Sequence, residues 1–213
     1  DPSGAVPDFV KDALAREAAR FGNYPAIAGT EEWRQAAAGW VVSRFGLPKE
    51  RIDPERHVLP LNGTRDGLFS CLFPLVPETK NGKRPIVAMP NPFYQVYAAG
   101  ALACGAEPLY VPALAEKGFL PDYAALPEEI LARIAAVYVC SPSNPEGAVA
   151  DEAYWRQLFA LAERHDFLVL ADECYADIWF DQPPVCALTA RFAQSNGFSR
   201  LLTFHSLSKR SGL

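Results

Sequence analysis

Leu-Leu-Thr-Phe-His-Ser-Leu-Ser-Lys, residues Leu201–Lys209, joins an apolar run to hydroxyl groups that flank a single lysine. The apolar run predicts a buried strand, which would place Lys209 at the carboxyl end of that strand. Open α/β sheets bind their ligands along that edge. A lysine there can form a Schiff base with a carbonyl compound, because partial burial favours the reactive neutral amine. Most lysines are solvated surface charges, so this interpretation depends on what the rest of the chain supplies.

The rest of the chain alternates short apolar runs with amphipathic segments. The predicted strands are 58–61, 86–89, 107–111, 136–140, 167–171 and 201–204. The predicted helices are 7–20, 31–45, 66–75, 93–104, 127–133 and 151–165. Strands that are apolar on both faces and alternate with helices are typical of a mostly parallel sheet covered by helices on both faces. The sequence therefore predicts an α/β fold.

Composition and charge narrow the functions that this chain can have. It has 213 residues, of which 50% are hydrophobic, and its net charge is −5. An acidic chain without a basic run argues against nucleic acid or an anionic membrane as a partner, and no apolar run approaches the ~18 residues of a membrane span. The five cysteines are an odd number without Cys-x-x-Cys spacing, so we expect reduced thiols in a cytoplasmic protein. No Gly-x-Gly-x-x-Gly or P-loop motif occurs, which weakens the nucleotide-binding alternatives.

Polar residues follow several of the predicted strands at their carboxyl ends. The turn at 62–65, Asn-Gly-Thr-Arg, leads into a helix, so its backbone N–H groups could bind an anion. Two prolines and a glycine fix the loop at 141–147, and Asp172 follows a wholly apolar strand and needs a donor partner. Taken singly, an ordinary turn, an Asn-Pro turn pair and a structural salt bridge explain these features equally well. Because the carboxyl ends of parallel strands meet at one edge, all of them would line one crevice.

Short motifs occur in a fixed order along the chain: Tyr24-Pro25…Gly29, Gly63-Thr64-Arg65, Ser143-Asn144-Pro145-x-Gly147, Asp172-x-x-Tyr175 and Ser206-x-x-Lys209. This order resembles the pattern of the fold-type I aminotransferases that depend on pyridoxal 5'-phosphate (PLP), and the resemblance covers essentially the whole chain. It implies the large PLP-binding domain of that family, with the small C-terminal domain absent from this chain. Residues 1–50 would be N-terminal helices and an interface segment, and residues 51–213 the PLP-binding domain, incomplete at its C-terminal end.

The resemblance implies catalytic roles for several motif residues. Lys209 would hold PLP covalently and then act as the general acid and base that moves the substrate's proton. Asp172 would keep the pyridine nitrogen protonated, so that the ring withdraws electrons. Asn144 and Tyr175 would hydrogen-bond to the phenolic oxygen of the ring. The expected catalytic residues are therefore Lys209, Asp172 and Tyr175, and no metal site is expected.

Other motif residues would bind the phosphate and the ring face. Those expected at the phosphate are Gly63, Thr64, Arg65 and Ser206. Tyr94 would stack on the ring, although Tyr94 and Tyr97 can also be interpreted as aromatic residues of a helix core. Glu146 departs from the pattern, because the family usually has threonine there.

The sequence around Tyr24 indicates a second subunit. Pro25 restrains Tyr24 to an extended conformation, and the matching tyrosine of the family reaches the phosphate in the neighbouring subunit. The resemblance therefore implies a homodimer. Tyr24 packed under its own loop is the alternative.

The substrates implied are an amino acid and a 2-oxo acid. The two elements that bind the substrate carboxylate in the family would lie before Asp1 and after Leu213. An aspartate or aromatic aminotransferase, a carbon–sulfur lyase or a decarboxylase stays open, because the shared core does not dictate which bond breaks.

Two more distant classes are also compatible with single features. A non-catalytic PLP-binding regulator would need a DNA-binding domain with a basic surface, which this sequence lacks. Ser206-x-x-Lys209 also fits the acyl-serine motif of penicillin-binding enzymes, but that motif opens a helix, whereas here it is expected to close a strand.

Overall fold

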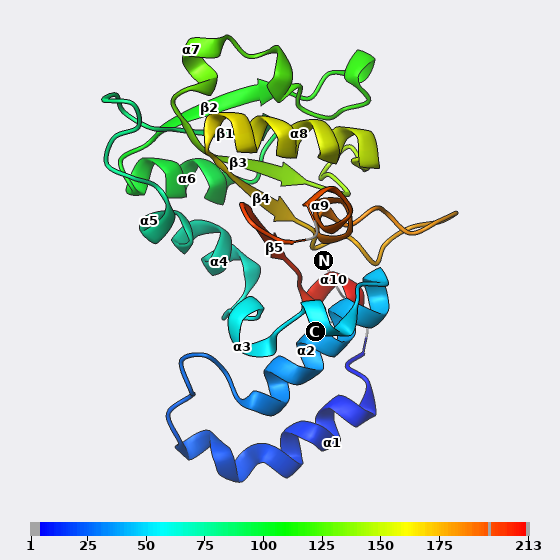
Figure 1. Ribbon diagram of the computed structural model, residues 1–213. Coiled ribbons are helices and arrows are strands. Elements are labelled where there is room, and N and C mark those ends of the chain that lie inside the picture. Colours follow the sequence, from blue (N-terminus) through cyan, green and yellow to red (C-terminus); the bar gives the residue numbers. More distant parts are fainter. Residues whose placement is uncertain (1–4, 196, 212–213) are drawn as a thin grey trace. The chain divides into compact units, whose positions relative to one another are not determined.

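The computed structural model describes residues 5–195 and 197–211 (Figure 1). The chain forms two compact units, Asp1–Leu61 with Leu207–Leu213 and Asn62–Ser206, called here the first and the second unit. This division does not test the predicted domain boundary at residue 50, which stays a prediction.

A parallel sheet forms the centre of the second unit. Its strands are β1 (Ile86–Asn91), β2 (Glu107–Pro112), β3 (Ile134–Cys140), β4 (Leu168–Asp172) and β5 (Leu201–Phe204). They lie in the order β2-β1-β3-β4-β5, and every pairing is parallel (Figure 1). The register sets Cys140 beside Asp172 and Asp172 beside Phe204. The carboxyl ends of β3, β4 and β5 are therefore level with one another.

Helices cover both faces of this sheet. They are α4 (Thr64–Ser70), α5 (Leu72–Leu75), α6 (Gln95–Ala103), α7 (Glu128–Leu131), α8 (Glu152–His165) and α9 (Ala187–Ser195). One buried cluster joins the sheet to α7, α8 and α9, and a second joins it to α4, α5 and α6. The predicted α/β fold, a mostly parallel sheet with helices on both faces, is confirmed.

β3 shows how the sequence builds the two cores. Val137 and Val139 belong to the cluster on the α8 face, whereas Ala136 and Tyr138 belong to the cluster on the α6 face. Successive side chains of a strand point to opposite faces, so a central strand covered on both sides must be apolar at every position. This is why an unbroken apolar run, and not an alternating one, marks each central strand.

The strand order creates a natural place for a ligand. The chain passes from β1 to β2 on one side and then crosses back to β3 on the other. The connections therefore diverge between β1 and β3, and open α/β sheets bind ligands at such a point, outside the carboxyl ends of the strands. The loops that begin at Pro92, Ser141, Glu173 and His205 all leave the sheet at this end.

The first unit is helical. It contains α1 (Asp8–Glu17), η1 (Ala18–Gly22), α2 (Glu31–Phe45), η2 (Lys49–Arg51), α3 (Pro54–His57) and α10 (Leu207–Ser211). As predicted, Thr30 caps α2: its Oγ1 accepts a hydrogen bond from the backbone N–H of Trp33 at 3.2 Å. Across all the described residues, no helix combines the length and the apolarity that crossing a membrane requires.

Two predicted elements differ in the structure. Residues 58–61 form no strand; Leu59 and Leu61 are exposed, and Pro60 has no N–H to donate to a sheet. The helix predicted to end at Leu75 is interrupted at Cys71, between α4 and α5. Pro74 cannot donate a hydrogen bond to the carbonyl four residues earlier, which accounts for the interruption.

Candidate active site

Asp172 is the most deeply placed of the predicted site residues. It is the last residue of β4 and is buried, with 6% of its surface exposed. Its Oδ2 accepts a hydrogen bond from the Tyr97 hydroxyl at 2.6 Å, and its Oδ1 accepts one from the backbone N–H of Cys174 at 3.2 Å. An ionised carboxylate offers about four acceptor positions, so each oxygen keeps room for a further donor. Asp172 can therefore accept a ligand N–H.

The loop after β3 brings Asn144 to Tyr175. The Asn144 Nδ2 donates a hydrogen bond to the Tyr175 hydroxyl oxygen at 3.2 Å. The loop itself is held by Ser143, whose Oγ accepts from the backbone N–H of Ala148 at 2.9 Å and donates to Glu146 at 3.2 Å. Glu146, the departure from the family pattern, therefore anchors this loop from within.

The turn before α4 is tied to two other strand ends. The Arg65 Nε donates to the Tyr94 hydroxyl oxygen at 2.8 Å, and the guanidinium carbon lies 5.8 Å from the centre of that ring. The Thr64 Oγ1 accepts a hydrogen bond from the Cys174 thiol at 3.4 Å. Gly63 begins the turn at a φ of +117°, a conformation that side-chain-bearing residues rarely adopt. Hydroxyl and guanidinium groups suited to a phosphate thus lie beside the loops that follow β1 and β4.

Tyr97 is a site residue that the sequence analysis did not identify. It is fully buried in the core next to α6, as the helix-core interpretation predicts, yet its hydroxyl holds Asp172. Its ring stacks on Tyr138 with centroids 4.1 Å apart and meets Tyr94 edge-on at 5.9 Å. The available signal was the spacing: residues three apart at the start of a helix lie on the same face, so a ligand-facing Tyr94 implies that Tyr97 lies near the same site.

Two cysteines next to the site are unreactive. Burial, followed by the negative charge of Asp172, raises the pKa of the Cys140 and Cys174 thiols well above their ordinary range. Only the thiolate is a strong nucleophile, so neither thiol competes for an aldehyde near neutral pH. A lysine amine therefore has no thiol rival from this pair.

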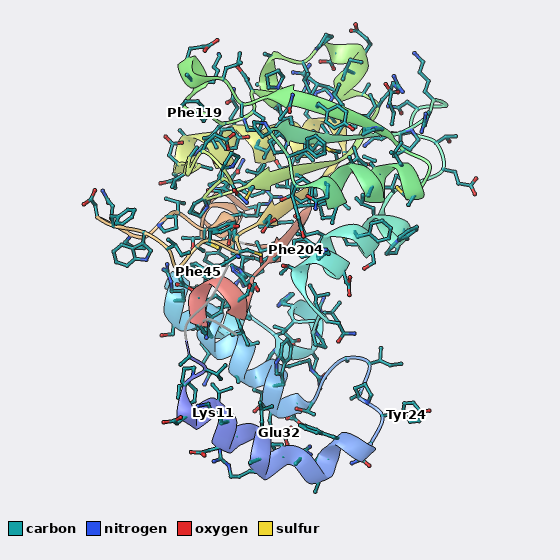
Figure 2. All side chains as sticks on the ribbon, turned by 180° about the vertical axis from the view of Figure 1, so that it is seen from behind. Lys11, Tyr24, Glu32, Phe45, Phe119 and Phe204 are labelled. Atoms are coloured by element: carbon teal, nitrogen blue, oxygen red, sulfur yellow. The ribbon has the colours of Figure 1, made fainter. Side chains whose placement is uncertain are left out.

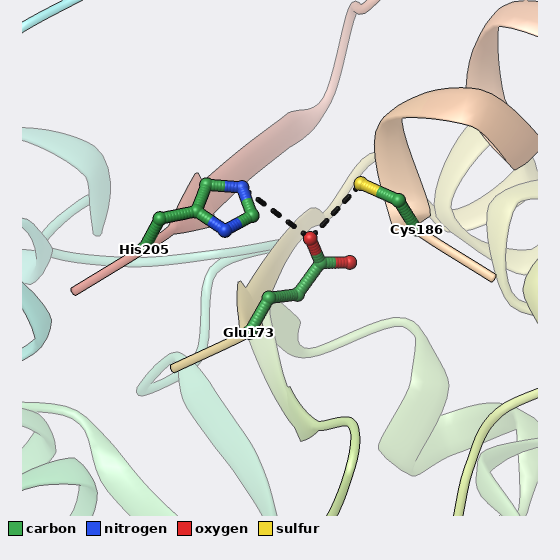
Figure 3. Close-up of side chains that lie close together, drawn as sticks. All are labelled: Glu173, Cys186 and His205. Carbon is green, nitrogen blue, oxygen red and sulfur yellow. Dashed lines mark hydrogen bonds and ion pairs between the residues drawn. The ribbon is translucent and has the colours of Figure 1, made fainter. Parts of the chain in front are cut away.

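A buried carboxylate braces the loop that follows Asp172 and carries Tyr175. Figure 3 shows Glu173 between Cys186 and His205. The Glu173 Oε2 accepts a hydrogen bond from the Cys186 thiol at 2.9 Å and lies 3.4 Å from the His205 Nε2. Its Oε1 accepts one from the backbone N–H of Ala187, at the start of α9, at 2.6 Å. Glu173 thereby links the ends of β4 and β5 to α9.

The same three side chains offer ligand atoms that all lie within 4.8 Å of one another, as in a metal site. A metal would need the Cys186 thiolate. Burial, followed by the charge of Glu173, raises the pKa of that thiol well above its ordinary range. With its proton in place, the Cys186 thiol donates a hydrogen bond to the Glu173 carboxylate, and the three side chains together brace the loop.

Lys209 and Tyr24 belong to the first unit. Lys209 is half-buried in α10, so the prediction that it lies at the end of a strand was wrong. The chain becomes helical directly after Ser206, a residue type that favours helix starts. Tyr24 is fully exposed between η1 and α2 (Figure 2). The role of Lys209 in holding PLP and the role of Tyr24 at the phosphate of the neighbouring subunit stay predictions.

Comparison with known proteins identifies the family. A family model described as aminotransferase class I and II matches residues 1–213. The chain belongs to the class I and II aminotransferases. Members of this family depend on PLP. Ser206 directly precedes α10, so the Ser-x-x-Lys motif does open a helix. The argument against penicillin-binding enzymes, that the motif closes a strand, was therefore wrong. The family match decides against that class.

Individual aminotransferases resemble the chain over nearly all of its length. An LL-diaminopimelate aminotransferase of Desulforudis audaxviator is 35% identical over 213 residues, which are 98% of this chain and 51% of that relative. A crystal structure of an aminotransferase from Neisseria meningitidis matches with a TM-score of 0.92 and 36% identity, over 100% of this chain and 53% of that one. A probable N-succinyldiaminopimelate aminotransferase of Thermus thermophilus matches with a TM-score of 0.83 and 26% identity, over 99% and 54%. The chain spans about half the length of the curated relatives it matches.

The side chains of the second unit fit PLP, the cofactor of these aminotransferases. Asp172 is a buried carboxylate with room for a ring N–H, which is what a protonated pyridine needs. The paired Asn144 and Tyr175 can donate to a phenolic oxygen. Thr64 and Arg65 supply a hydroxyl and a cation, which suit a phosphate.

Proposed function

We propose that this protein is a PLP-dependent aminotransferase that exchanges an amino group between an amino acid and a 2-oxo acid. The observation that carries the proposal is the buried Asp172 at the end of β4, with spare acceptor capacity on both oxygens. The Asn144–Tyr175 pair and the Arg65–Tyr94 pair belong to the same unit and supply donors of the kinds that the rest of the cofactor requires. Together these groups cover the nitrogen, the phenolic oxygen and the phosphate.

PLP, when bound, supplies an electron-withdrawing ring that stabilises negative charge at the α carbon of the substrate. In the proposed site the Asp172 carboxylate holds a proton at the ring nitrogen, which strengthens that withdrawal. The Asn144 amide and the Tyr175 hydroxyl donate to the phenolic oxygen. Thr64, Arg65 and Ser206 bind the phosphate.

Lys209 has two proposed tasks. Its Nζ would hold the cofactor covalently through the aldehyde group. The Lys209 amine would also accept the proton from the α carbon of the substrate as a base and then donate a proton as an acid, which is the acid–base work of the reaction. Cys140 and Cys174, which remain thiols, leave this chemistry to the lysine.

The proposed substrate is N-succinyl-diaminopimelate, with glutamate and 2-oxoglutarate as the other pair, in lysine biosynthesis. Four segments are similar in sequence to those of the succinyldiaminopimelate transaminases: 61–65, 90–97, 172–175 and 204–211. The similarity to a probable N-succinyldiaminopimelate aminotransferase supports this choice. The LL-diaminopimelate aminotransferases among the relatives favour unmodified LL-diaminopimelate as the second candidate.

The proposed working form is a homodimer in the cytoplasm. In the first unit α1 buries none of its residues, and Tyr24, Ile27 and Phe9 are exposed, which supports a second copy as the cover for this surface. Tyr24 would then reach the phosphate in the partner subunit. All five cysteines are free thiols, as expected in a reducing compartment.

A half-reaction tests this function. When the full-length protein loaded with PLP is mixed with L-glutamate alone, we expect one equivalent of 2-oxoglutarate, a shift of the cofactor's visible absorption and no ammonia. The ratio of kcat/KM for N-succinyl-diaminopimelate and LL-diaminopimelate then chooses between the two substrates. Ammonia and pyruvate from a sulfur-containing amino acid, without the shift in absorption, would identify a lyase instead.

A further inference from the structure

The Asp172 carboxylate is held from two directions. The backbone N–H of Cys174 donates to Oδ1 at 3.2 Å, and the Tyr97 hydroxyl donates to Oδ2 at 2.6 Å. The first donor lies only two residues further along the chain, so it moves with Asp172. The second comes from α6, on a residue 75 positions away in the sequence. Tyr97 is therefore the contact that ties the carboxylate to α6 and not merely to its own chain segment.

Tyr97 has little freedom to move. Its ring stacks on Tyr138 at 4.1 Å with an interplanar angle of 8°. Tyr138 is itself anchored, because its hydroxyl donates to the carbonyl oxygen of Leu68 in α4. Tyr97, Tyr138 and Leu68 are all fully buried, so water does not replace these bonds. Because the Tyr97 ring packs on an anchored residue, its hydroxyl can hold the Asp172 carboxylate in place.

Tyr97 also contacts a second predicted cofactor-binding residue. Its ring meets the ring of Tyr94 edge-on, at 5.9 Å and 88°. One buried side chain thus touches both the residue expected at the face of the cofactor ring and the residue expected at its nitrogen. Burial, followed by the charge of Asp172, raises the pKa of Tyr97 well above its ordinary value, so its hydroxyl is a permanent donor.

We propose that Tyr97 is a positioning residue, which rests on the proposed function: it sets the Asp172 carboxylate in the orientation that accepts the ring N–H of the cofactor. Without the hydroxyl, the carboxylate is held through Oδ1 alone and can rotate about its Cβ–Cγ bond. An acceptor that is free to rotate loses part of its interaction with the ring nitrogen, because it must be ordered when the cofactor binds. The loss appears in cofactor affinity and in the rate of proton removal, and not in substrate affinity.

Tyr97→Phe tests this inference in the full-length protein, because it keeps the stacked ring and removes only the donor. A bond to a charged group of this kind corresponds to about a tenfold change, so we expect the Kd for PLP to rise about tenfold. We expect kcat to fall about as much while KM for the amino donor changes by less than about threefold. Tyr123→Phe is the matched control: Tyr123 is equally buried and donates a hydrogen bond of 2.6 Å, but to the carbonyl oxygen of Tyr138. It should lower the stability of the apoprotein like Tyr97→Phe and leave the Kd for PLP within about twofold of the unsubstituted protein.

A double-mutant cycle separates positioning from packing. In the Asp172→Asn background there is no carboxylate for Tyr97 to orient, so Tyr97→Phe should change the Kd for PLP by less than about threefold. A tenfold effect in that background, or a Kd for Tyr97→Phe equal to that of the unsubstituted protein, overturns the inference. Failure of the unsubstituted protein to bind PLP overturns the proposed function instead, so the two failures are distinguishable.

Discussion

Single residues at the site are fixed through contacts with residues that are distant in sequence. Arg65 illustrates this, because its Nε donates a hydrogen bond to the Tyr94 hydroxyl oxygen, 29 positions away in the sequence. The other N–H groups of the guanidinium can still donate to a ligand. An exposed cation next to the hydroxyl of Thr64 suits a phosphate, whereas a cofactor ring without a phosphate does not need one. The two halves of the cofactor should therefore respond differently to the loss of Arg65.

Arg65→Ala is expected to weaken PLP binding by about 10- to 100-fold, because it removes charge-assisted hydrogen bonds to the phosphate. Pyridoxal, which lacks the phosphate, should bind with less than about a threefold change. Arg84→Ala is the control, since Arg84 donates to the backbone carbonyls of Gly105 and Ala106. Fluorescence titration of the apoprotein with both compounds measures the effect, and an equal loss for PLP and pyridoxal would contradict the assignment.

The Cys71 thiol links stability to pH. Burial raises its pKa to about 11, whereas a thiol in an unfolded chain titrates near ~8.5. The folded protein therefore keeps a proton that the unfolded chain has lost, and this contribution to stability is complete below pH ~8.5 and is lost as the pH rises through about 11. Between pH 9 and 11, roughly, the free energy of unfolding should fall more steeply in the unsubstituted protein than in Cys71→Ala, by at most about 1.4 kcal/mol per pH unit. Urea unfolding at several pH values measures both slopes, and identical slopes would refute this prediction.

Among the elements, the strands were predictable from the sequence, and the segments that connect them were less so. An apolar run between turn residues has few alternatives to a central strand, which is why β1 to β5 lie where the sequence places them. The run at 58–61 is apolar but contains Pro60, and it lies outside the sheet. α10 is missed because Leu207-Ser208-Lys209 is too short for helical periodicity to appear.

The candidate site could be predicted only in part, for a related reason. Asp172 is recognisable because a carboxylate that directly follows an apolar strand needs a partner. The identity of that partner is not local information: Tyr97 lies 75 positions away and reads as a core aromatic. The brace of Glu173 with Cys186 and His205 escapes notice in the same way, since it joins three separate elements.

Glu173 tests how strongly one side chain supports three elements. Glu173→Ala leaves the buried Ala187 N–H and the Cys186 thiol without their acceptor, which should lower the free energy of unfolding by about 2–4 kcal/mol. Glu152→Ala, which removes an exposed pair with Arg156 in α8, should cost less than about 1 kcal/mol. Urea unfolding at neutral pH compares the two variants. Equal costs would mean that the brace adds no more than a surface ion pair.

On the scale of the whole molecule, the chain has a sheet unit with a prepared carboxylate and a helical unit with an exposed surface. Tyr24 and Ile27 are fully exposed between η1 and α2, and Phe21 is largely exposed at the end of η1. Such side chains are costly in water unless another molecule covers them. The proposed dimer, in which Tyr24 acts in the partner's site, would account for this exposure.

Mixed dimers decide whether Tyr24 acts across the interface. One subunit carries Tyr24→Phe and the other Lys209→Ala, so only the first can hold PLP covalently. If Tyr24 acts in the partner's site, that subunit faces an intact Tyr24 and should bind PLP as the unsubstituted protein does. PLP affinity as weak as in the Tyr24→Phe homodimer would show that Tyr24 serves its own subunit.

The central claim is that Lys209 holds PLP covalently while Asp172 accepts a hydrogen bond from the cofactor's ring nitrogen. Borohydride reduction of the PLP-loaded protein, followed by peptide mapping, tests it most directly because reduction fixes the cofactor to the lysine that carries it. We predict a single labelled peptide that contains Lys209, and no labelled peptide from the Lys209→Ala variant. A label on any other lysine, or none at all in the unsubstituted protein, would contradict the claim.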